Sequence, residues 1–350
     1  MARRAGRGAP AAPLGQRQGV DPVRVRLPDP ADGDSDADGA AGRATWTTIG
    51  GYLLERYGAA VGRERIEAML AAGRFVTADG PVGALTPYAP GAWVWFHRDF
   101  PPEPAVPFPV EVLHRDERIV VADKPHFLAT TPRGRHVTET ALARLRRELD
   151  LPLLSPAHRL DRLTAGVVLF VVRPEDRGAY QTLFRDRLVR KEYEAVAAYD
   201  PAVALPATVR SRIVKERGQM AAREVPGPYN AESVVELLAR RGGLGRYLLR
   251  PLTGRTHQLR LHMQALGLPL LNDPIYPEVW AEAAAEEGAD PYARPLQLLA
   301  RTLEFTDPLT GRELRFASAR RLSAWPSDAD EPGGERGRRT TDGGQLTADG

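Results

Sequence analysis

The 350-residue chain contains no cysteine at all. This absence excludes disulfides, thiolate nucleophiles and the common cysteine-based zinc sites, so carboxylate, imidazole, hydroxyl and guanidinium groups must supply any chemistry. Long apolar runs are also missing: none approaches the roughly 18 residues of a membrane helix, and no apolar segment follows the basic N-terminus as it would in a signal peptide. We therefore expect a cytoplasmic protein with no membrane association.

Lysine is scarce as well, because only Lys124, Lys191 and Lys215 are lysines among the 48 basic residues. The net charge of +3 is small, but it is unevenly distributed. Residues 201–265 hold 11 Lys or Arg against four Glu and no Asp. Such an excess suits binding of a polyanion, although a solvated face of a basic protein would give the same pattern.

Composition and hydrophobic periodicity divide the N-terminal third of the chain. Residues 1–44 carry Arg and then Asp in a Gly, Pro and Ala background, which predicts a disordered tail. Residues 45–97 show two stretches of helical spacing followed by short strand patterns, which predicts a small α/β domain. Five prolines between residues 101 and 109 predict a stiff linker, which we assign to residues 98–107.

Residues 108–321 have the pattern of one larger domain, and residues 322–350 return to a polar composition that predicts a second disordered tail. Helices and strands do not alternate regularly there, so a mixed α+β sheet fits better than a doubly wound one. Helices are expected over 138–149, from Pro174 to about 187, and from about 259 to 266. Strands are expected at 119–122, 167–172, 191–196, 208–214, 232–238 and 247–252.

A charged loop directly precedes the most apolar of these strands. Residues 158–166 read His-Arg-Leu-Asp-Arg-Leu-Thr-Ala-Gly and lead into the run at 167–172. Arg159 and Arg162 flank Asp161, which suits an ionised nucleophile or electrostatic stabiliser better than a proton donor. The alternative is that Asp161 caps the following turn or holds the loop to the sheet by an ion pair.

Two further polar motifs lie beside apolar strands, Lys-Glu-Tyr at 191–193 and Gly-Arg-Thr-His-Gln-Leu-Arg-Leu-His at 254–262. With 158–166, where Ala165 replaces a usual serine, they resemble the three motifs of the RluA family of RNA pseudouridine synthases, in the same order. The resemblance covers about residues 108–318. It implies an α+β catalytic domain with a mixed, mainly antiparallel sheet flanked by helices. The small domain at 45–97 resembles, more distantly, a ribosomal-protein-S-four-type RNA-binding domain.

The resemblance implies an isomerase that converts specific uridines of rRNA or tRNA to pseudouridine after flipping the base out of its stack. The reaction neither adds nor removes atoms, so no cofactor and no metal is expected, and the partner is RNA bound by a monomer. Asp161 is implied to be the essential carboxylate, Tyr193 to lie against the flipped uracil, and Arg255 to pair with Asp161. The residues expected to bind RNA are Arg159, which would enter the space left by the base, Arg162, Lys191, His257 and Arg260.

Histidine spacing alone could indicate a metal site, but we expect structural hydrogen bonds for His158, His257 and His262. Two departures from the family pattern bear on which RNA is recognised. Lys-Pro-His-Phe at 124–127 replaces Lys-Pro-x-Gly, and Leu-Leu-Ala at 298–300 replaces Leu-His-Ala.

Two other functions remain open at this point. One is a catalytically inactive RNA-binding or ribosome-assembly factor on the same scaffold, and the other is a different enzyme with an aspartate nucleophile, such as a hydrolase. The intact Asp161, Tyr193 and Arg255 favour the active isomerase, and a hydrolase would leave the motifs at 191–193 and 254–262 unexplained. The sequence does not distinguish a covalent sugar ester, addition to the uracil ring and a glycal route.

Overall fold

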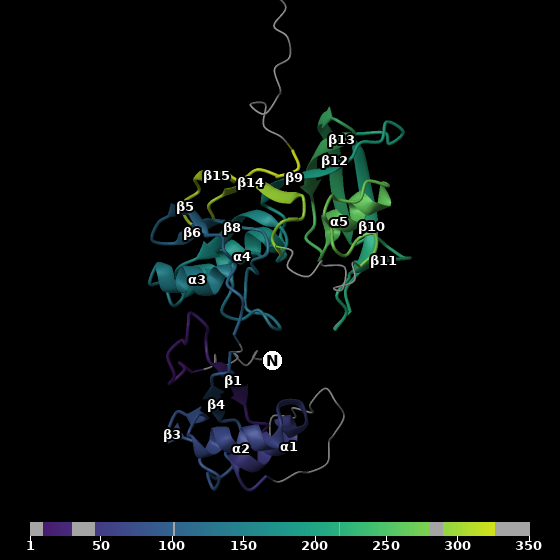
Figure 1. The fold of residues 1–350 in the computed structure, drawn as a ribbon. Coiled ribbons are helices and arrows are strands. Elements are labelled where there is room, and N and C mark those ends of the chain that lie inside the picture. The colour runs from purple at the N-terminus through teal and green to yellow at the C-terminus, as the bar shows by residue number, and fades with distance from the viewer. Residues whose placement is uncertain (1–9, 30–45, 101, 217, 280–289, 326–350) are drawn as a thin grey trace, which may run out of the picture. The chain divides into compact units, whose positions relative to one another are not determined.

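The computed structural model describes residues 10–29, 46–100, 102–216, 218–279 and 290–325 (Figure 1). The chain divides into two compact units. Unit 1 comprises Met1–Leu163, Val167–Leu188 and Phe305–Phe316, and unit 2 comprises Thr164–Gly166, Val189–Glu304 and Ala317–Gly350.

The N-terminal part of unit 1 is a small α/β module. Its sheet has the order β1-β4-β2-β3. Helix α1 begins after Thr48, whose hydroxyl accepts a hydrogen bond from the Gly51 N–H and so caps the helix. Its elements are β1 (Val23–Arg26), α1 (Ile49–Val61), α2 (Arg63–Ala71), β2 (Val76–Thr77), β3 (Gly80–Pro81) and β4 (Trp93–Phe96).

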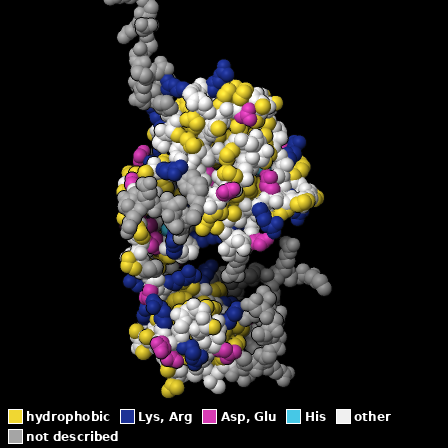
Figure 2. All heavy atoms as spheres, turned by 45° about the vertical axis from the view of Figure 1, so that its right-hand side comes forward, with side chains coloured by type: hydrophobic (Ala, Val, Ile, Leu, Met, Phe, Trp, Pro, Cys, Tyr) yellow, Lys and Arg dark blue, Asp and Glu magenta, His cyan; other side chains and the backbone are white. Residues whose placement is uncertain are grey.

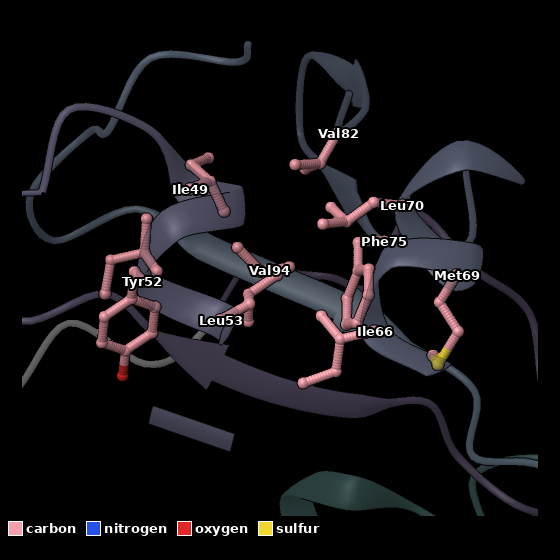
Figure 3. Packing of buried hydrophobic residues seen from close by; sticks show 10 residues of the cluster. Ile49, Tyr52, Leu53, Ile66, Met69, Leu70, Phe75, Val82 and Val94 are labelled. Carbon is pink, nitrogen blue, oxygen red and sulfur yellow. The ribbon is translucent and has the colours of Figure 1, made fainter. Parts of the chain in front are cut away.

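Apolar side chains from both helices and the sheet close the core of this module (Figure 3). Ile49 and Leu53 of α1 and Ile66 of α2 belong to this cluster, in which Val94 of β4 lies beside Leu53 and Phe75 lies beside Ile66. The two helices and short strands expected within 45–97 are therefore present.

The predicted tail over residues 1–44 needs a correction. Val23–Arg26 form β1, which pairs antiparallel with β4, and Leu27 is fully buried. The Val-Arg-Val-Arg alternation turns alternate side chains inward, a strand signal that the surrounding Gly, Pro and Ala hid. Residues 1–9 and 30–44 of the predicted tail lie outside the described residues.

The predicted proline-rich linker is attached to the rest of unit 1 rather than acting as a bare spacer. The Glu103 carboxylate accepts hydrogen bonds of 2.8, 2.9 and 3.1 Å from the N–H groups of Val137, Thr138 and Glu139. Arg144 of α3 (Ala141–Glu148) donates to the carbonyl of Val106 in the linker and to that of Phe108 just after it. These contacts fix the segment at the start of α3.

The remainder of unit 1 is built around β8 (Ala165–Val171), which belongs to unit 1 from Val167 on and in which every residue is buried. Its neighbour is β6 (Ile119–Lys124), which pairs antiparallel with β5 (Glu111–Arg115), and β7 (Ser155–Pro156) pairs antiparallel with the end of β8. Pro174–Asp176 form a single 3-10 turn that leads into α4 (Arg177–Arg185).

Unit 2 contains antiparallel strands in the order β11-β10-β12-β13-β9-β14, and β14 pairs in parallel with Ala165 and Gly166 at the start of β8. Gly242 and Gly243 form the tight turn between β12 and β13, both with positive φ. This mixed, mainly antiparallel arrangement confirms the predicted α+β class. The elements are β9 (Arg190–Ala198), β10 (Ala207–Val214), β11 (Arg223–Val225), β12 (Ala231–Arg241), β13 (Leu244–Pro251), α5 (Gln258–Ala265) and β14 (Leu298–Thr306), of which Phe305 and Thr306 belong to unit 1. The last strand, β15 (Glu313–Ala317), pairs with β14 and lies in unit 1 up to Phe316.

The start of the predicted C-terminal tail also needs a correction. Leu322 is 3% exposed and packs with Ala165, Val196 and Leu299 in one apolar cluster. Leu299 occupies the place of the histidine in the family pattern and serves this core. Residues 326–350 of the predicted tail lie outside the described residues. Among the helices of the described ranges, none is long and apolar enough to cross a membrane.

Candidate functional site

The loop that carries Asp161, residues 158–163, is the Asp161 loop. Asp161 itself is half-buried. The Thr130 hydroxyl donates to the Leu160 carbonyl at 2.8 Å and accepts from the Leu160 N–H at 3.1 Å. On the other side of Asp161, the His126 Nδ1 donates to the Leu163 carbonyl at 2.7 Å. The backbone is therefore held on both sides of the carboxylate.

Lys124 provides a third anchor for this loop. Its side chain is fully buried, and its Nζ donates to the carbonyls of Pro125 at 2.9 Å, Leu128 at 2.8 Å and Arg162 at 3.4 Å. A buried ammonium needs such acceptors to offset its lost hydration. Lys124 thus joins the turn at the end of β6 to the Asp161 loop.

Positive charge lies close to this loop within unit 1. Arg159 is exposed and Arg162 is half-buried. Burial lowers the pKa of His136, and the positive charges of Arg162 and Arg135 lower it further. The electrostatic potential around Arg135, Arg159 and Arg162 is therefore positive, which favours binding of an anionic partner.

Gly166 explains why a glycine closes the motif at 158–166. Its φ is +117°, and an added Cβ would lie 2.2 Å from the Ala300 carbonyl oxygen and 2.7 Å from the Ala300 nitrogen. Only glycine permits this approach between β14 and the start of β8. The last residue of the motif at 158–166 is therefore held by close backbone packing on β14.

In unit 2, Tyr193 lies in β9 opposite Leu249 of β13 and Ala300 of β14, and it is half-buried. Two residues earlier in β9, the Lys191 Nζ donates to the Thr253 carbonyl at 3.4 Å. This bond brings Lys191 beside the turn that carries Arg255.

One buried side chain, Gln258, organises that turn. Its Oε1 accepts from the Thr253 hydroxyl at 2.7 Å and from the Arg255 N–H at 3.0 Å. Its Nε2 donates to the Glu232 carbonyl at 2.9 Å and the Ser233 hydroxyl at 2.8 Å. The Arg255 backbone is thus fixed while its side chain lies at the surface, where Nε donates to a main-chain carbonyl.

Arg260 requires a correction. Its guanidinium is 2% exposed and forms a two-pronged ion pair with the buried Asp273, with distances of 2.7 and 2.5 Å. It also lies 5.0 Å from the ring centroid of Tyr276. A guanidinium held in this way has no surface to offer a phosphate, so the predicted RNA contact of Arg260 gives way to a structural role.

The three histidines make hydrogen bonds, as expected from the sequence. His158 Nε2 accepts from the Leu169 N–H at 3.1 Å, and the ring stacks on Phe184 with centroids 4.3 Å apart. His257 Nδ1 is hydrogen-bonded to the Tyr276 hydroxyl at 2.9 Å. His262 is fully buried, its Nε2 lies 3.1 Å from the Ser211 hydroxyl, and burial lowers its pKa to about 4.

The arginine-rich stretch 201–265 is partly neutralised by ion pairs. Arg210 pairs with Glu232, and Arg250 lies between Glu192 and Glu236. On the face drawn in Figure 2, Lys and Arg side chains are interspersed with acidic and hydrophobic ones. Acidic partners therefore offset part of the basic excess of this stretch.

The candidate residues thus fall into two groups. Arg159, Asp161 and Arg162 share one anchored loop of unit 1, and Lys191 lies beside the turn of Arg255 and His257 in unit 2. Sequence reasoning missed the residues that hold these groups in place: Lys124, Thr130 and Gln258. In the sequence, Lys124 is visible only as a lysine at the end of an apolar strand and Gln258 only as a glutamine inside a polar motif. Neither position indicates which residue it will contact.

Comparison with known proteins gives matches to one family. Residues 118–265, which include Asp161, Tyr193 and Arg255, match the RNA pseudouridylate synthase family. The human pseudouridylate synthase RPUSD2 is 36% identical over 206 residues, which cover 56% of this chain and 36% of that protein. The dual-specificity RNA pseudouridine synthase RluA of Salmonella typhi is 33% identical over 216 residues, which cover 59% of this chain and 90% of that protein.

Two further similarities were found. The mitochondrial tRNA pseudouridine(32) synthase of Saccharomyces cerevisiae is 32% identical over 198 residues, which cover 55% of this chain and 42% of that protein. The solved structure of human RNA Pseudouridylate Synthase Domain Containing 4 is 26% identical, covers 59% of this chain and 87% of that chain, and has a TM-score of 0.45. The chain thus spans about a third of the human relative RPUSD2 and most of the bacterial one.

Proposed function

Because the chain belongs to the RluA-type family of RNA pseudouridine synthases, we propose that it isomerises specific uridines of RNA to pseudouridine. The observation that carries the proposal is the anchored Asp161 loop. Hydrogen bonds to Thr130, Lys124 and His126 hold the main chain around Asp161. A reacting carboxylate needs such preorganisation to meet its target in a defined position.

The reaction breaks the bond between uracil N1 and ribose C1′ and forms a bond between uracil C5 and C1′. C5 loses a proton and N1 gains one, so atoms and electrons balance without a cofactor. Asp161 acts as the essential carboxylate, either as a nucleophile or as a base that also stabilises positive charge on the sugar. The covalent, ring-addition and glycal routes all use it.

The other site residues receive roles in binding. Tyr193 presents an aromatic face to the flipped uracil, a contact worth about 1–3 kcal/mol per base that tolerates rotation of the ring. Arg255 orients the reacting groups, and its pairing with Asp161 stays a prediction. Arg159, Arg162, Lys191 and His257 contact the RNA, and Arg159 enters the space left by the flipped base.

The substrate is proposed to be tRNA or rRNA. The relative from Salmonella typhi is named for dual specificity and the yeast relative for a tRNA position, which supports this range. An involvement in rRNA processing, a monomeric state and a cytoplasmic location belong to the same proposal. Size-exclusion chromatography with light scattering tests the monomeric state, and cell fractionation tests the cytoplasmic location.

We also propose that the small module at 45–97 adds RNA contacts. Arg56 and Arg63, on α1 and at the start of α2, have exposed positions that suit phosphate binding. Replacing both with Glu should weaken RNA binding without disturbing the core shown in Figure 3. If the RNA affinity of this double variant equals that of the wild type at low salt, Arg56 and Arg63 of the module do not contact RNA.

The experiment that tests the enzymatic function is pseudouridine mapping of total RNA from cells with and without the gene. Sites lost on deletion should return with the wild-type gene and stay absent with Asp161→Ala. If Asp161→Ala restores both growth and all sites, the aspartate mechanism is wrong. If no site depends on the gene while its loss impairs ribosome assembly, the inactive RNA-binding factor becomes the better account.

A further inference from the structure

Phe127 has a backbone conformation that does not suit its side chain. Its φ is +65°, in the left-handed region that glycine occupies readily and that bulky residues avoid. The side chain is half-buried rather than part of the fully buried core. Backbone strain of this kind is concentrated at functional sites, so a strained aromatic residue beside a proposed active site indicates a function beyond packing in the core.

The turn that carries Phe127 is rigidly attached to the Asp161 loop. The Lys124 Nζ binds the carbonyls of Pro125 and Leu128 on either side of it, at 2.9 and 2.8 Å. The neighbouring His126 donates from Nδ1 to the Leu163 carbonyl at 2.7 Å. The position of Phe127 is therefore coupled to the position of Asp161 through two side chains, and all of these residues belong to unit 1.

The surroundings of the turn favour a nucleotide over an apolar ligand. The same ammonium that shapes the turn holds the Arg162 carbonyl at 3.4 Å, and the positive field of Arg162 extends to His136. The His126 ring lies 6.3 Å from the Phe127 ring, centroid to centroid. The turn thus carries two aromatic rings beside the Asp161 loop, on which Arg159 is exposed. Proteins hold unpaired bases on aromatic faces and their phosphates with basic side chains.

We propose that Phe127 is a specificity-determining residue that stacks on an RNA base next to the target uridine. The inference rests on the proposed function and extends it, because it assigns substrate recognition to the place where this sequence departs from the Lys-Pro-x-Gly pattern. The left-handed conformation is the one that a glycine in this pattern would adopt without strain. In this chain Phe127 occupies that position and adds an aromatic ring.

The test uses two matched variants of the full chain, Phe127→Asn and Phe127→Tyr. Asn tolerates the left-handed conformation, and this relief of strain offsets the loss of a half-buried ring, so the melting temperature of Phe127→Asn should stay close to that of the wild type. Its kcat/KM on total RNA from gene-deleted cells should fall about five- to 150-fold, the range that corresponds to one lost stacking contact. Phe127→Tyr keeps the ring and should stay within about threefold of the wild type.

A double-mutant cycle with altered RNA separates stacking from other effects. The probes are a synthetic hairpin containing the mapped uridine and four counterparts, each with an abasic ribose at one of the two nucleotides on either side. One abasic counterpart should weaken wild-type turnover by the same factor as Phe127→Asn. The variant should lose nothing further on that RNA.

The outcomes are distinct from those that test the enzymatic function. If the wild type forms pseudouridine and Phe127→Asn matches Phe127→Tyr on every RNA, the stacking role is wrong while the function stands. If Phe127→Asn loses stability and activity together, Phe127 is a structural residue and the inference is also overturned. If the wild type itself forms no pseudouridine, the proposed function fails first.

Discussion

Replacing Thr130 with Val removes one hydroxyl and preserves the shape of the side chain. Thr130 is 3% exposed, and its hydroxyl bonds both the carbonyl and the N–H of Leu160, the residue before Asp161. The variant therefore takes two partners from a buried main-chain segment without opening a cavity. It perturbs the position of Asp161 and leaves the carboxylate itself unchanged.

The expected effect follows from these two lost partners. An unsatisfied buried donor or acceptor costs about 1–3 kcal/mol, so two of them cost about 2–6 kcal/mol unless the loop relaxes. If the loop relaxes, it recovers part of this stability but displaces Asp161. A displacement of about 1 Å at a reacting group can lower a rate by about a hundredfold. We therefore expect Thr130→Val to lose at least 2 kcal/mol of stability or at least tenfold in the single-turnover rate.

The assay measures both quantities on the same preparations. Urea unfolding followed by circular dichroism gives the stability, and pseudouridine formation on total RNA from gene-deleted cells, with enzyme in excess, gives the rate. Thr130→Ser is the matched control, because it keeps the hydroxyl and should stay within about 1 kcal/mol of the wild type. If Thr130→Val equals Thr130→Ser in stability and in rate, the Thr130 contacts do not position the Asp161 loop.

Three further predictions concern packing, charge and pH. Gly166→Ala should lose about 3 kcal/mol or more, because its Cβ would lie 2.2 Å from the Ala300 carbonyl oxygen, whereas Gly178→Ala meets nothing within 4 Å and should be neutral or slightly stabilising; equal urea midpoints would contradict this. Arg260→Met leaves the buried Asp273 carboxylate unpaired and should cost about 3–5 kcal/mol, while the RNA affinity of the folded fraction stays unchanged; a selective loss of affinity would restore Arg260 as an RNA contact. The pKa of His262 is lowered to about 4 from an ordinary 6.5, so the unfolded chain binds the extra proton first, and stability should fall by up to about 3 kcal/mol as the pH drops from 6.5 to 4. His262→Gln should flatten that part of the pH profile, and an identical slope would assign it to other groups.

The strands of the larger domain could be predicted from sequence where hydrophobic pattern alone decides them. The apolar run at 167–172 predicted β8, which spans Ala165–Val171 and is buried throughout. Pro174 marked the start of the next helical segment, although the first turn is 3-10 rather than α. Local composition misled at β1, because Val23–Arg26 become a strand only through pairing with β4.

The polar motifs predicted which loops carry the candidate site, but not what holds them. Thr130 and Leu160 are 30 residues apart, and Lys124 and Arg162 are 38 apart, so no local pattern connects them. For Arg260, the sequence motif suggested a function that the fold does not support. Its place in a polar motif suggested an RNA contact, and only the fold reveals Asp273 as its buried partner.

We expect Asp161 to be the residue that makes uridine isomerisation in RNA possible. The direct measurement is pseudouridine formation by purified full-length protein on total RNA from gene-deleted cells, with wild type compared with Asp161→Asn at matched RNA affinity and thermal stability. The wild type should convert one or a few uridines, and Asp161→Asn should form no measurable product while still binding RNA. Product formation by Asp161→Asn at the wild-type rate would contradict the account.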